Sequence, residues 1–593
     1  MNLLTQTISS IKVPDEALSS SVHAALSAHT DGAFGRLGDA LVRYIRITGE
    51  RHPAAPRTRV IISCADHGVA AESVSAYPPE TTLNMMCNYL IAHGGAANAV
   101  ANYADAQLIV ADLGVNADSM DIPHLLHHSI ARGTANMTAG ASMTRAQAVQ
   151  AIETGIALAQ TWADAGGRCI LPGEMGISNT TSSAAIVAAL LSLTPEEVTG
   201  RGANISDARL AHKIEIVRRA LSVNAPDPHD GLDVLAKVGG FELGCIAGLI
   251  LGASARRMLV ILDGANTTSA ALIAHALAPN CTHYLLASHA SLTEHSQPHA
   301  LRRLGLSPML RLDIRLSEAA GSSIALSMLH QMLRVWETID SPRPRASVFA
   351  PIIAETKSYE TANEASPLDQ RAMDACQYRL DNLAKPIHSL GYLEQIAVRL
   401  AGITGCERPS LDLGAALLLV TDADGIPAPI ASILTAMASH TGLSPHHLPC
   451  LPLAEGSTYA IGYTAAQKNA RTHPILILGM AADAADTGRC TSLLHGALTG
   501  AAAAGRLILP GDEQTDCIAR KFAAAHPGIA PHILHILPDM LTPDAPLPAG
   551  MAGILGCDII RAALHVLNDM KTFAETGVAV AIDGVGAGRQ VRT

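Results

Sequence analysis

The sequence is poor in aromatic and charged residues, and this scarcity already excludes several classes of protein. Aromatic residues make up 3% and charged residues 16% of the 593 residues, whereas hydrophobic residues make up 49%. This composition argues against a disordered chain and favours an alanine-rich globular core. The formal net charge of -11 comes from scattered acids, and no block of Lys and Arg could neutralise a row of phosphates. Nucleic acid is therefore not expected as a partner.

The sequence also lacks a long uncharged apolar run. Its most apolar stretch, residues 243–262, contains Arg256 and Arg257, whereas a membrane-spanning helix needs about 20 largely uncharged residues. We interpret this stretch as a buried helix followed by a buried strand and expect no membrane partner. The first residues lack the basic start and apolar core of a secretory signal, which predicts a cytoplasmic protein.

Paired cysteines and standard metal-binding spacings are missing as well. Eleven cysteines occur without any C-x-x-C pair, which favours reduced, mostly buried thiols over disulfides. Two histidine clusters, HLLHH (124–128) and HHLPC (446–450), have too few ligands at a standard spacing for zinc. We interpret them as neutral surface or capping histidines and predict no metal.

What the sequence does contain is a series of short apolar runs that end in Asp or Gly and alternate with alanine-rich stretches. The runs are VIISCADHG, LIVADLG, CILPGEMG and MLVILDGAN. Such runs are typical of parallel strands covered by helices on both faces. They predict a layered, Rossmann-like α/β fold, with ligands bound just beyond the carboxyl ends of the strands.

The length predicts at least two domains, because single cores stop growing at about 250 to 300 residues. Between residues 337 and 370, Pro, Ser and charged residues replace the apolar periodicity, which indicates a boundary. We predict a catalytic domain at 1–345, a linker at 346–370 and a degenerate second copy of the fold at 371–593.

Four segments after the linker repeat earlier ones in the same order, which indicates an internal duplication. The pairs are 377–405 with 30–49, 416–428 with 59–71, 475–498 with 169–190, and 577–588 with 257–268. By this alignment Met480 replaces Glu174, and the second copy ends before any counterpart of Glu318. The second copy is therefore not expected to be catalytic.

Two turns in the first copy could bind an anion. Residues 178–182 offer hydroxyls and backbone N–H groups at a predicted helix start, where the helix dipole favours negative charge. On local physics alone, ordinary helix capping is the simpler explanation of the same residues. Near the second turn, at Gly200 and Gly202, Lys213 could balance a phosphate, or it could be a solvated helical lysine.

Six separated motifs of the first half identify it more closely. They are DHGVAAESVSAYPPETT (66–82), GEMGISNTTSSAA (173–185), DGLDVLAKVGGFEL (230–243), DGANTTSAAL (263–272), SHAS (288–291) and RLSEAAG (315–321). In this order they resemble the nicotinate-nucleotide:5,6-dimethylbenzimidazole phosphoribosyltransferase family. The resemblance implies an α/β domain with a small helical subdomain. It also implies transfer of the 5-phosphoribosyl group of nicotinate mononucleotide to a benzimidazole-type base, with inversion at the anomeric carbon and without a cofactor.

The resemblance also implies residue roles. Glu318 would accept the proton of the incoming base, although a glutamate at a helix start is commonly a surface residue stabilised by the helix dipole. The implied nucleotide cradle comprises Glu174, Gly176, Asn179, Thr180, Gly202, Lys213 and Ser291, and the implied base pocket comprises Tyr77, Asn84 and Met85. Ser317 and Ala319 replace two glycines of the family pattern beside Glu318, which leaves the rate and the accepted base open.

The second half is expected to assist the first. The family's N-terminal motif L-D-x-L-x-K-P-x-G-S-L-G is matched better at 380–391 than in the first copy. Because resemblance to this family implies a homodimer, we expect 371–593 to form a pseudo-subunit that packs on the catalytic half as a partner subunit would. Further homo-oligomerisation is left open. Two alternatives remain: a regulatory protein that binds nucleotide or base without turnover, and the same transfer to a non-benzimidazole base such as a purine or a phenol.

Overall fold

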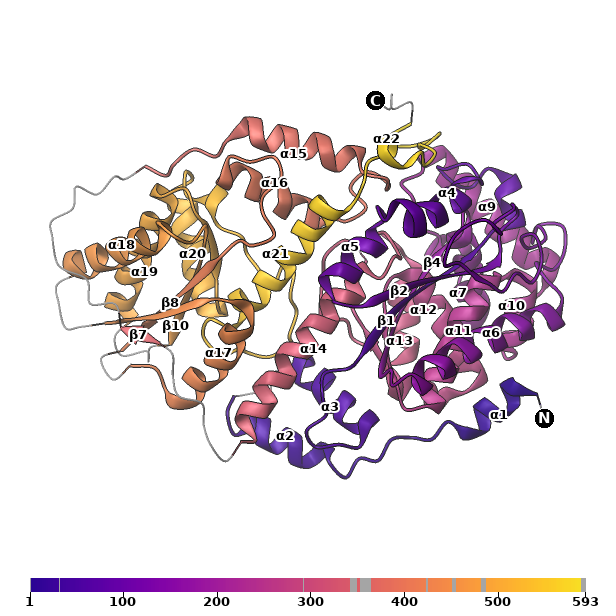
Figure 1. Cartoon of the computed structure of the whole chain (residues 1–593), viewed down its shortest axis with the longest axis horizontal. Coiled ribbons are helices and arrows are strands. Elements are labelled where there is room, and N and C mark those ends of the chain that lie inside the picture. The colour runs from indigo at the N-terminus through magenta and orange to yellow at the C-terminus, as the bar shows by residue number, and fades with distance from the viewer. Residues whose placement is uncertain are drawn as a thin grey trace.

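The computed structural model contains two parallel β-sheets, one in each half of the chain (Figure 1). It describes residues 2–30, 32, 34–291, 293–341, 349–351, 364–422, 425–450, 455–481 and 487–587. Most of the linker predicted at 346–370 lies outside these ranges.

The first sheet has the strand order β3-β2-β1-β4-β5-β6, and every pairing in it is parallel. Its strands are β1 (Thr58–Ala65), β2 (Gln107–Gly114), β3 (Leu126–His127), β4 (Cys169–Met175), β5 (Leu259–Leu262) and β6 (Leu285–Ala287). Consecutive apolar residues such as Val60, Ile61 and Ile62 are fully buried, because the sheet is covered on both faces. The predicted parallel α/β fold is confirmed.

Helices surround this sheet. They are α1 (Leu3–Ser10), α2 (Ser19–Ser27), α3 (Arg36–Thr48), η1 (Gly68–Glu72), α4 (Thr81–Cys87), η2 (Asn88–Ala92), α5 (Ala96–Tyr103), α6 (Arg145–Asp164), α7 (Asn179–Leu191), α8 (Pro195–Val198), α9 (Asp207–Asn224), α10 (Gly231–Val238), α11 (Phe241–Ala255), α12 (Ala265–Leu277), η3 (Pro279–Tyr284), α13 (Ser296–Leu304) and α14 (Ala320–Ile339). The apolar stretch at 243–262 is the buried helix α11 followed by the buried strand β5, as predicted.

The second sheet repeats the central strand order of the first. Its strands are β7 (Ala350–Pro351), β8 (Ala415–Thr421), β9 (Ser444–Pro449), β10 (Ile475–Ala481) and β11 (Leu507–Pro510), in the order β11-β10-β8-β9-β7. The helices are α15 (Gln370–Asn382), α16 (Tyr392–Thr404), α17 (Ala428–Thr441), α18 (Glu455–Ala470), α19 (Thr487–Ala503), α20 (Glu513–Ala525), η5 (Ala530–His532), α21 (Met551–Asp569) and α22 (Phe573–Thr576). The order β9-β8-β10-β11 corresponds to β2-β1-β4-β5, so the chain does contain a second copy of the fold.

The structure corrects two parts of the predicted alignment between the copies. After β10, helix α19 packs against α18 as α11 packs against α6, so α19 corresponds to α11 and not to α7. The segment 577–587 contains no strand, and the counterpart of β5 is β11. An apolar run ending in Asp-Gly suggested a strand at 577–584, but β11 already occupies that place in the sheet.

The second copy also extends further than the sequence indicated. Helix α21 corresponds to α14, because each begins after an N-cap residue in the left-handed region, Gly550 (φ 82°) and Ala319 (φ 64°). Aligning these helix starts places Ala549 at the position of Glu318. The expectation that the second copy stops before such a counterpart was wrong, but the counterpart is an alanine and carries no carboxylate.

The two halves pack through reciprocal contacts, as the subunits of a symmetric dimer do. Leu310 forms an antiparallel bridge with Leu541, its own counterpart in the helix alignment, so this bridge lies on a pseudo-twofold axis. Arg36 N donates to Pro543 O at 2.7 Å, and correspondingly Tyr392 N donates to Leu312 O at 3.0 Å.

One apolar core runs from the first half across the interface to the second sheet, and a smaller separate core lies under α18 and α19. Helix α21 lies in the shared core and contacts α5 and α14. Its composition and length are those of a membrane-spanning helix, but 83% of its most apolar window is buried inside the protein. We therefore interpret α21 as an interface helix between the halves.

Candidate active site

A cavity opens at the carboxyl ends of β1, β4, β5 and β6, where the fold predicts a ligand. Ten of the eleven residues implicated by the sequence motifs line it: Tyr77, Met85, Glu174, Gly176, Asn179, Thr180, Gly202, Lys213, Ser291 and Glu318. The exception is Asn84, whose Oδ1 accepts a hydrogen bond from Ala579 N of the second half at 3.3 Å. Asn84 thus touches the C-terminal segment rather than the cavity.

Glu318 is buried at the end of the loop before α14 and is 3% exposed. Its Oε2 accepts a hydrogen bond from Ala97 N at the start of α5, at 3.1 Å. Burial raises the pKa of Glu318 to about 7, although the Ala97 N–H counteracts part of this effect. A carboxylate with this pKa is suited to accept a proton near neutral pH.

Asp263 fixes the loop that carries Glu318. Its carboxylate accepts hydrogen bonds from Ala319 N at 3.1 Å and from Ser322 N at 2.9 Å. Ala319 has a φ of 64°, a conformation that costs a residue with a Cβ about 1–2 kcal/mol. The loop keeps this conformation because a buried carboxylate holds both N–H groups. Ser317, like Glu318, lines the cavity, and its Oγ faces Gly264.

Glu174 forms the centre of a buried amide network. Asn266 Nδ2 donates to its Oε1 at 2.6 Å, and Asn179 Nδ2 donates to its Oε2. Burial raises the pKa of Glu174 to about 8, against the opposing effect of the Asn266 amide. Asn266 was not predicted as a site residue, although it lies within the DGANTTSAAL motif.

His67 and Glu242 form a buried pair that the sequence did not predict either. His67 Nε2 contacts Glu242 Oε1 at 2.7 Å, and His67 Nδ1 lies 3.1 Å from Ser182 Oγ on α7. Both side chains are almost completely buried. Both residues lie in the quoted motifs, so the signal was present, but nothing in the sequence showed that the two would pair.

The polar end of the cavity is built around Lys213. Its Nζ donates to Thr180 Oγ1 at 2.8 Å and to Gly200 O at 3.1 Å, and the residue is 1% exposed. Burial lowers the pKa of Lys213 to about 8, while Glu294 counteracts this effect. Glu294 in turn accepts a hydrogen bond from Gly202 N at 2.8 Å. The local alternative of a solvated lysine is excluded.

The second half completes the wall of the cavity. The contributed residues are Ala384, Lys385 and Pro386, before α16, and Phe573 and Val578, at and after α22. Lys385 Nζ pairs with Glu394 Oε1 at 2.8 Å in a fully buried contact. Neither segment was predicted as part of the site by residue, although 380–391 was expected to supply a missing motif.

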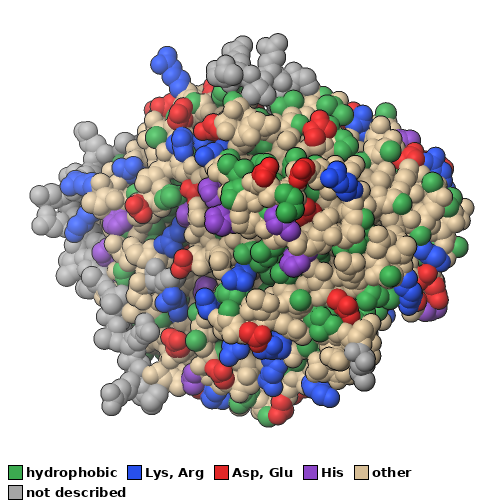
Figure 2. Space-filling model, turned by 45° about the vertical axis from the view of Figure 1, so that its right-hand side comes forward, with side chains coloured by type: hydrophobic (Ala, Val, Ile, Leu, Met, Phe, Trp, Pro, Cys, Tyr) green, Lys and Arg blue, Asp and Glu red, His purple; other side chains and the backbone are tan. Residues whose placement is uncertain are grey.

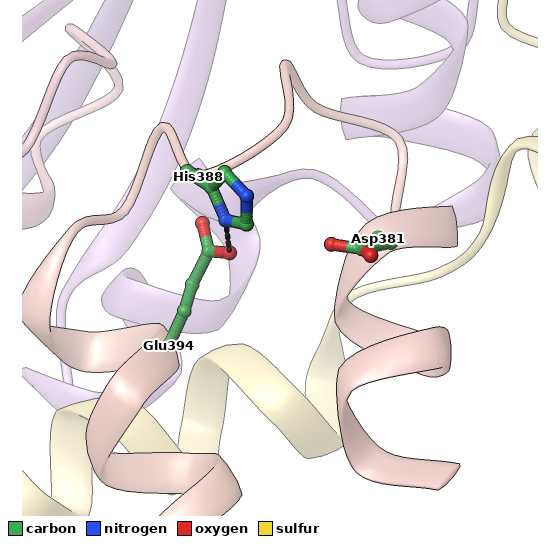
Figure 3. A group of neighbouring side chains, drawn as sticks. All are labelled: Asp381, His388 and Glu394. Carbon is green, nitrogen blue, oxygen red and sulfur yellow. Dashed lines mark ion pairs between the residues drawn. The ribbon is translucent and has the colours of Figure 1, made fainter. Parts of the chain in front are cut away.

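In Figure 3, which draws Asp381, His388 and Glu394, His388 is directed toward Glu394 and Asp381 lies on the neighbouring helix α15. The ligand atoms of these three side chains lie within 4.8 Å of one another. Burial opposes ionisation, yet Lys385 and His388 together hold the pKa of Glu394 below its ordinary value. The ammonium of Lys385 is already paired with the carboxylate of Glu394. We therefore interpret the cluster as a structural anchor for residues 384–391 rather than as a metal site.

Chemistry rather than size singles out this cavity. A larger cavity of about 680 Å³ lies between the halves at the opposite ends of β1 and β2, and none of the predicted residues is among those described around it.

On the face shown in Figure 2, blue and red side chains are interspersed, as the scattered charges of the sequence predict.

Comparison with known proteins is consistent with this geometry. A family model described as phosphoribosyltransferase matches residues 11–342 and again 365–434. The nicotinate-nucleotide–dimethylbenzimidazole phosphoribosyltransferase of Syntrophotalea carbinolica is 46% identical over 343 residues, which cover 96% of that protein and 56% of this chain. That of Chloroflexus aggregans is 45% identical over 338 residues, which cover 95% of that protein and 56% of this chain. This chain belongs to the same phosphoribosyltransferase family.

Solved structures agree. Two structures of the Thermus thermophilus enzyme, one of them named CobT, superpose with TM-scores of 0.51 and 0.52 at 36% and 37% identity. They cover 55% and 54% of this chain and 96% of their own chains. The family resemblance drawn from the six motifs is confirmed. Since these relatives span little more than half of this chain, they match about one copy of its fold.

Proposed function

We propose that this chain transfers the 5-phosphoribosyl group of nicotinate mononucleotide to 5,6-dimethylbenzimidazole or a related base. The observation that carries the proposal is a buried carboxyl group, Glu318, with a pKa of about 7, in the same cavity as the polar cradle around Lys213. One end can accept a proton, and the other can bind a phosphate.

In the proposed reaction, one nitrogen of the acceptor base attacks the anomeric carbon of the ribose. The bond from that carbon to the pyridinium nitrogen breaks, and its electron pair stays with the departing nicotinate. The proton on the other nitrogen of the acceptor passes to Glu318. General-base catalysis of this kind commonly contributes a factor of about 10²–10⁴.

For the nucleotide, we propose that Lys213, Thr180, Gly202 and Ser291 bind the phosphate. Burial lowers the pKa of Lys213 to about 8, and the negative charge of a bound phosphate would favour its protonated form. Glu174, Gly176 and Asn179 would contact the ribose side of the nucleotide. Tyr77 and Met85 are proposed to border the base.

For the second half, we propose a pseudo-subunit that completes one site and has none of its own. The reciprocal hydrogen bonds of Arg36 and Tyr392 and the continuous core support a dimer-like union within one chain. Met480 and Ala549 stand where the first copy has Glu174 and Glu318. We therefore propose residues 1–345 as the catalytic domain and 371–593 as its structural partner, acting together in the cytoplasm.

Incubation of the full chain with nicotinate mononucleotide and 5,6-dimethylbenzimidazole tests the reaction. We expect release of nicotinate and formation of α-ribazole 5'-phosphate, identified by mass. A panel with benzimidazole, adenine and a phenol defines the acceptor. Saturable binding of nucleotide and base without product would favour the regulatory alternative, which rests on Ser317 and Ala319 beside Glu318.

A fragment of residues 1–345 tests the role of the second half. We expect it to aggregate or lose activity, because it exposes the apolar interface and lacks five residues of the cavity wall. A fragment that is monomeric, soluble and fully active would contradict the pseudo-subunit proposal.

A further inference from the structure

The last described residues, 570–587, cross from the second half onto the first and are here named the C-terminal strap. In Figure 1 this segment leaves α21, forms α22 and ends near α4 and α9. Near its start, Lys571 N donates to Gly94 O at 3.0 Å. Near its end, Asp583 Oδ2 accepts from Ser206 N at 3.0 Å and lies 3.3 Å from Arg209 Nε.

Between these anchors, the strap is bonded to the segments that carry the proposed base pocket. Ala579 N donates to Asn84 Oδ1 at 3.3 Å, and Asn84 precedes Met85. Ile582 N donates to Ala76 O at 2.7 Å, and Ala76 precedes Tyr77. The strap therefore contacts both segments of that pocket through its own backbone N–H groups, one bonded to the side chain of Asn84 and the other to the backbone carbonyl of Ala76.

The start of the strap is also close to Glu318, the proposed general base. Lys571 bonds to Gly94, and three residues later Ala97 N donates to Glu318 Oε2. Helix α22 packs against η2, which immediately precedes this turn. A planar base whose N–H group reaches Glu318 would thus have α22 and the residues after it as neighbours.

The strap contributes only apolar side chains to the described cavity wall, Phe573 and Val578. They are 4% and 5% exposed. Apolar walls discriminate by shape, with about a tenfold effect or more per methylene group, and they leave the polar substituents of a ligand unpaired. Methyl groups on a benzimidazole suit such a wall better than the amino group of adenine does.

We propose that Phe573 and Val578 select the acceptor base, so that the second half determines base preference while the first half performs the transfer. This inference rests on the proposed function. It assigns to the strap a specificity role separate from the nucleotide cradle, whose residues all come from the first half.

The test compares wild type with Val578→Ala and Val578→Phe in the full chain. Values of kcat/KM are measured for benzimidazole and 5,6-dimethylbenzimidazole at saturating nicotinate mononucleotide. We expect both variants to lower the preference for the dimethylated base about tenfold, Val578→Ala by removing its contact and Val578→Phe by filling its space. The KM for nicotinate mononucleotide should change less than about twofold, because the cradle is untouched.

The matched control is Val585→Ala, a valine of the same strap that is 63% exposed and does not line the cavity. It should leave the base preference unchanged. If Val578→Phe does not fold, Val578→Ala and the equilibrium affinity for each base still decide. An unchanged preference in active Val578 variants overturns the strap proposal alone. A wild-type chain that releases no nicotinate with any base overturns the proposed function and removes the basis of this inference.

Discussion

The two halves share a fold but have kept different parts of it. The first half has the buried carboxylates Glu174 and Glu318 and the Lys213 cradle, whereas the second has Met480 and Ala549 at the two carboxylate positions. Among the described residues of the second half, no counterparts of α7–α10 lie between β10 and α19. The second half instead contributes the Lys385 loop (residues 384–391) and the C-terminal strap, both of which reach the cavity of the first half. Under the proposed function, one copy carries the catalytic groups and the other completes the site, because each needs to be present only once.

The largest expected effect concerns the carboxylate that distinguishes the halves. Glu318→Gln should lower kcat by about a hundredfold or more, because the amide cannot accept the proton of the base. Binding of nicotinate mononucleotide, measured by calorimetry, should be nearly unchanged. Ala549→Ser, at the counterpart position, is the control and should leave turnover intact. Full activity in Glu318→Gln would place the base elsewhere.

The pH dependence of kcat/KM should report the titration of Glu318 and Lys213, which only the first half contains. Because burial raises the pKa of Glu318 to about 7, its ionised form decreases about tenfold per pH unit below that value. Above about pH 8, Lys213 loses its proton, and nucleotide binding should weaken. The profile is therefore expected to rise to about pH 7 and fall beyond about 8. A flat profile from about pH 5.5 to 7 would contradict the role of Glu318.

A matched pair of glycines separates stability from site completion. Gly35 and Gly391 both have a φ of 53°, and a Cβ at either would collide with a carbonyl of the other half, Pro543 O or Leu312 O. Replacing either by Ala should lower the free energy of unfolding by about 1–3 kcal/mol. Only Gly391→Ala, next to the Lys385 loop, should also reduce kcat/KM, by several-fold. Equal losses of activity would show that the halves do not differ in this way.

The smallest expected effect concerns Ala319. The φ of 64° at Ala319 disfavours a residue with a Cβ, so Ala319→Gly should relieve about 1 kcal/mol of backbone strain. The greater chain entropy that glycine loses on folding offsets part of this gain, so the melting temperature should rise only slightly. The counterpart of Ala319 in the second half, Gly550, is already a glycine. Gly550→Ala should therefore lower the stability. Thermal unfolding of both variants checks this. A lower melting temperature for Ala319→Gly would mean that the loop is not strained at this residue.

The sequence was informative about several site residues in short contiguous motifs, although it did not single out Asn266, His67 or Glu242 within them. Glu174, Lys213 and Glu318 follow strands or turns whose apolar runs and glycines are locally legible, and all three line the cavity. The error at 577–584 has the same origin. A short apolar run before Asp-Gly has the local pattern of a strand end, and nothing local shows that β11 already fills that place.

By itself, the sequence determined the parallel α/β fold, the duplication and most of one cavity, because these depend on periodicity and on residues adjacent in the chain. Only the tertiary structure decided that the cavity is shared between the halves. Lys385 and Val578 are separated by nearly the whole second copy, and they meet at the site because reciprocal packing about Leu310 and Leu541 brings the second half against the first. Contacts of this kind depend on how two folded surfaces fit, which no local pattern of residues specifies.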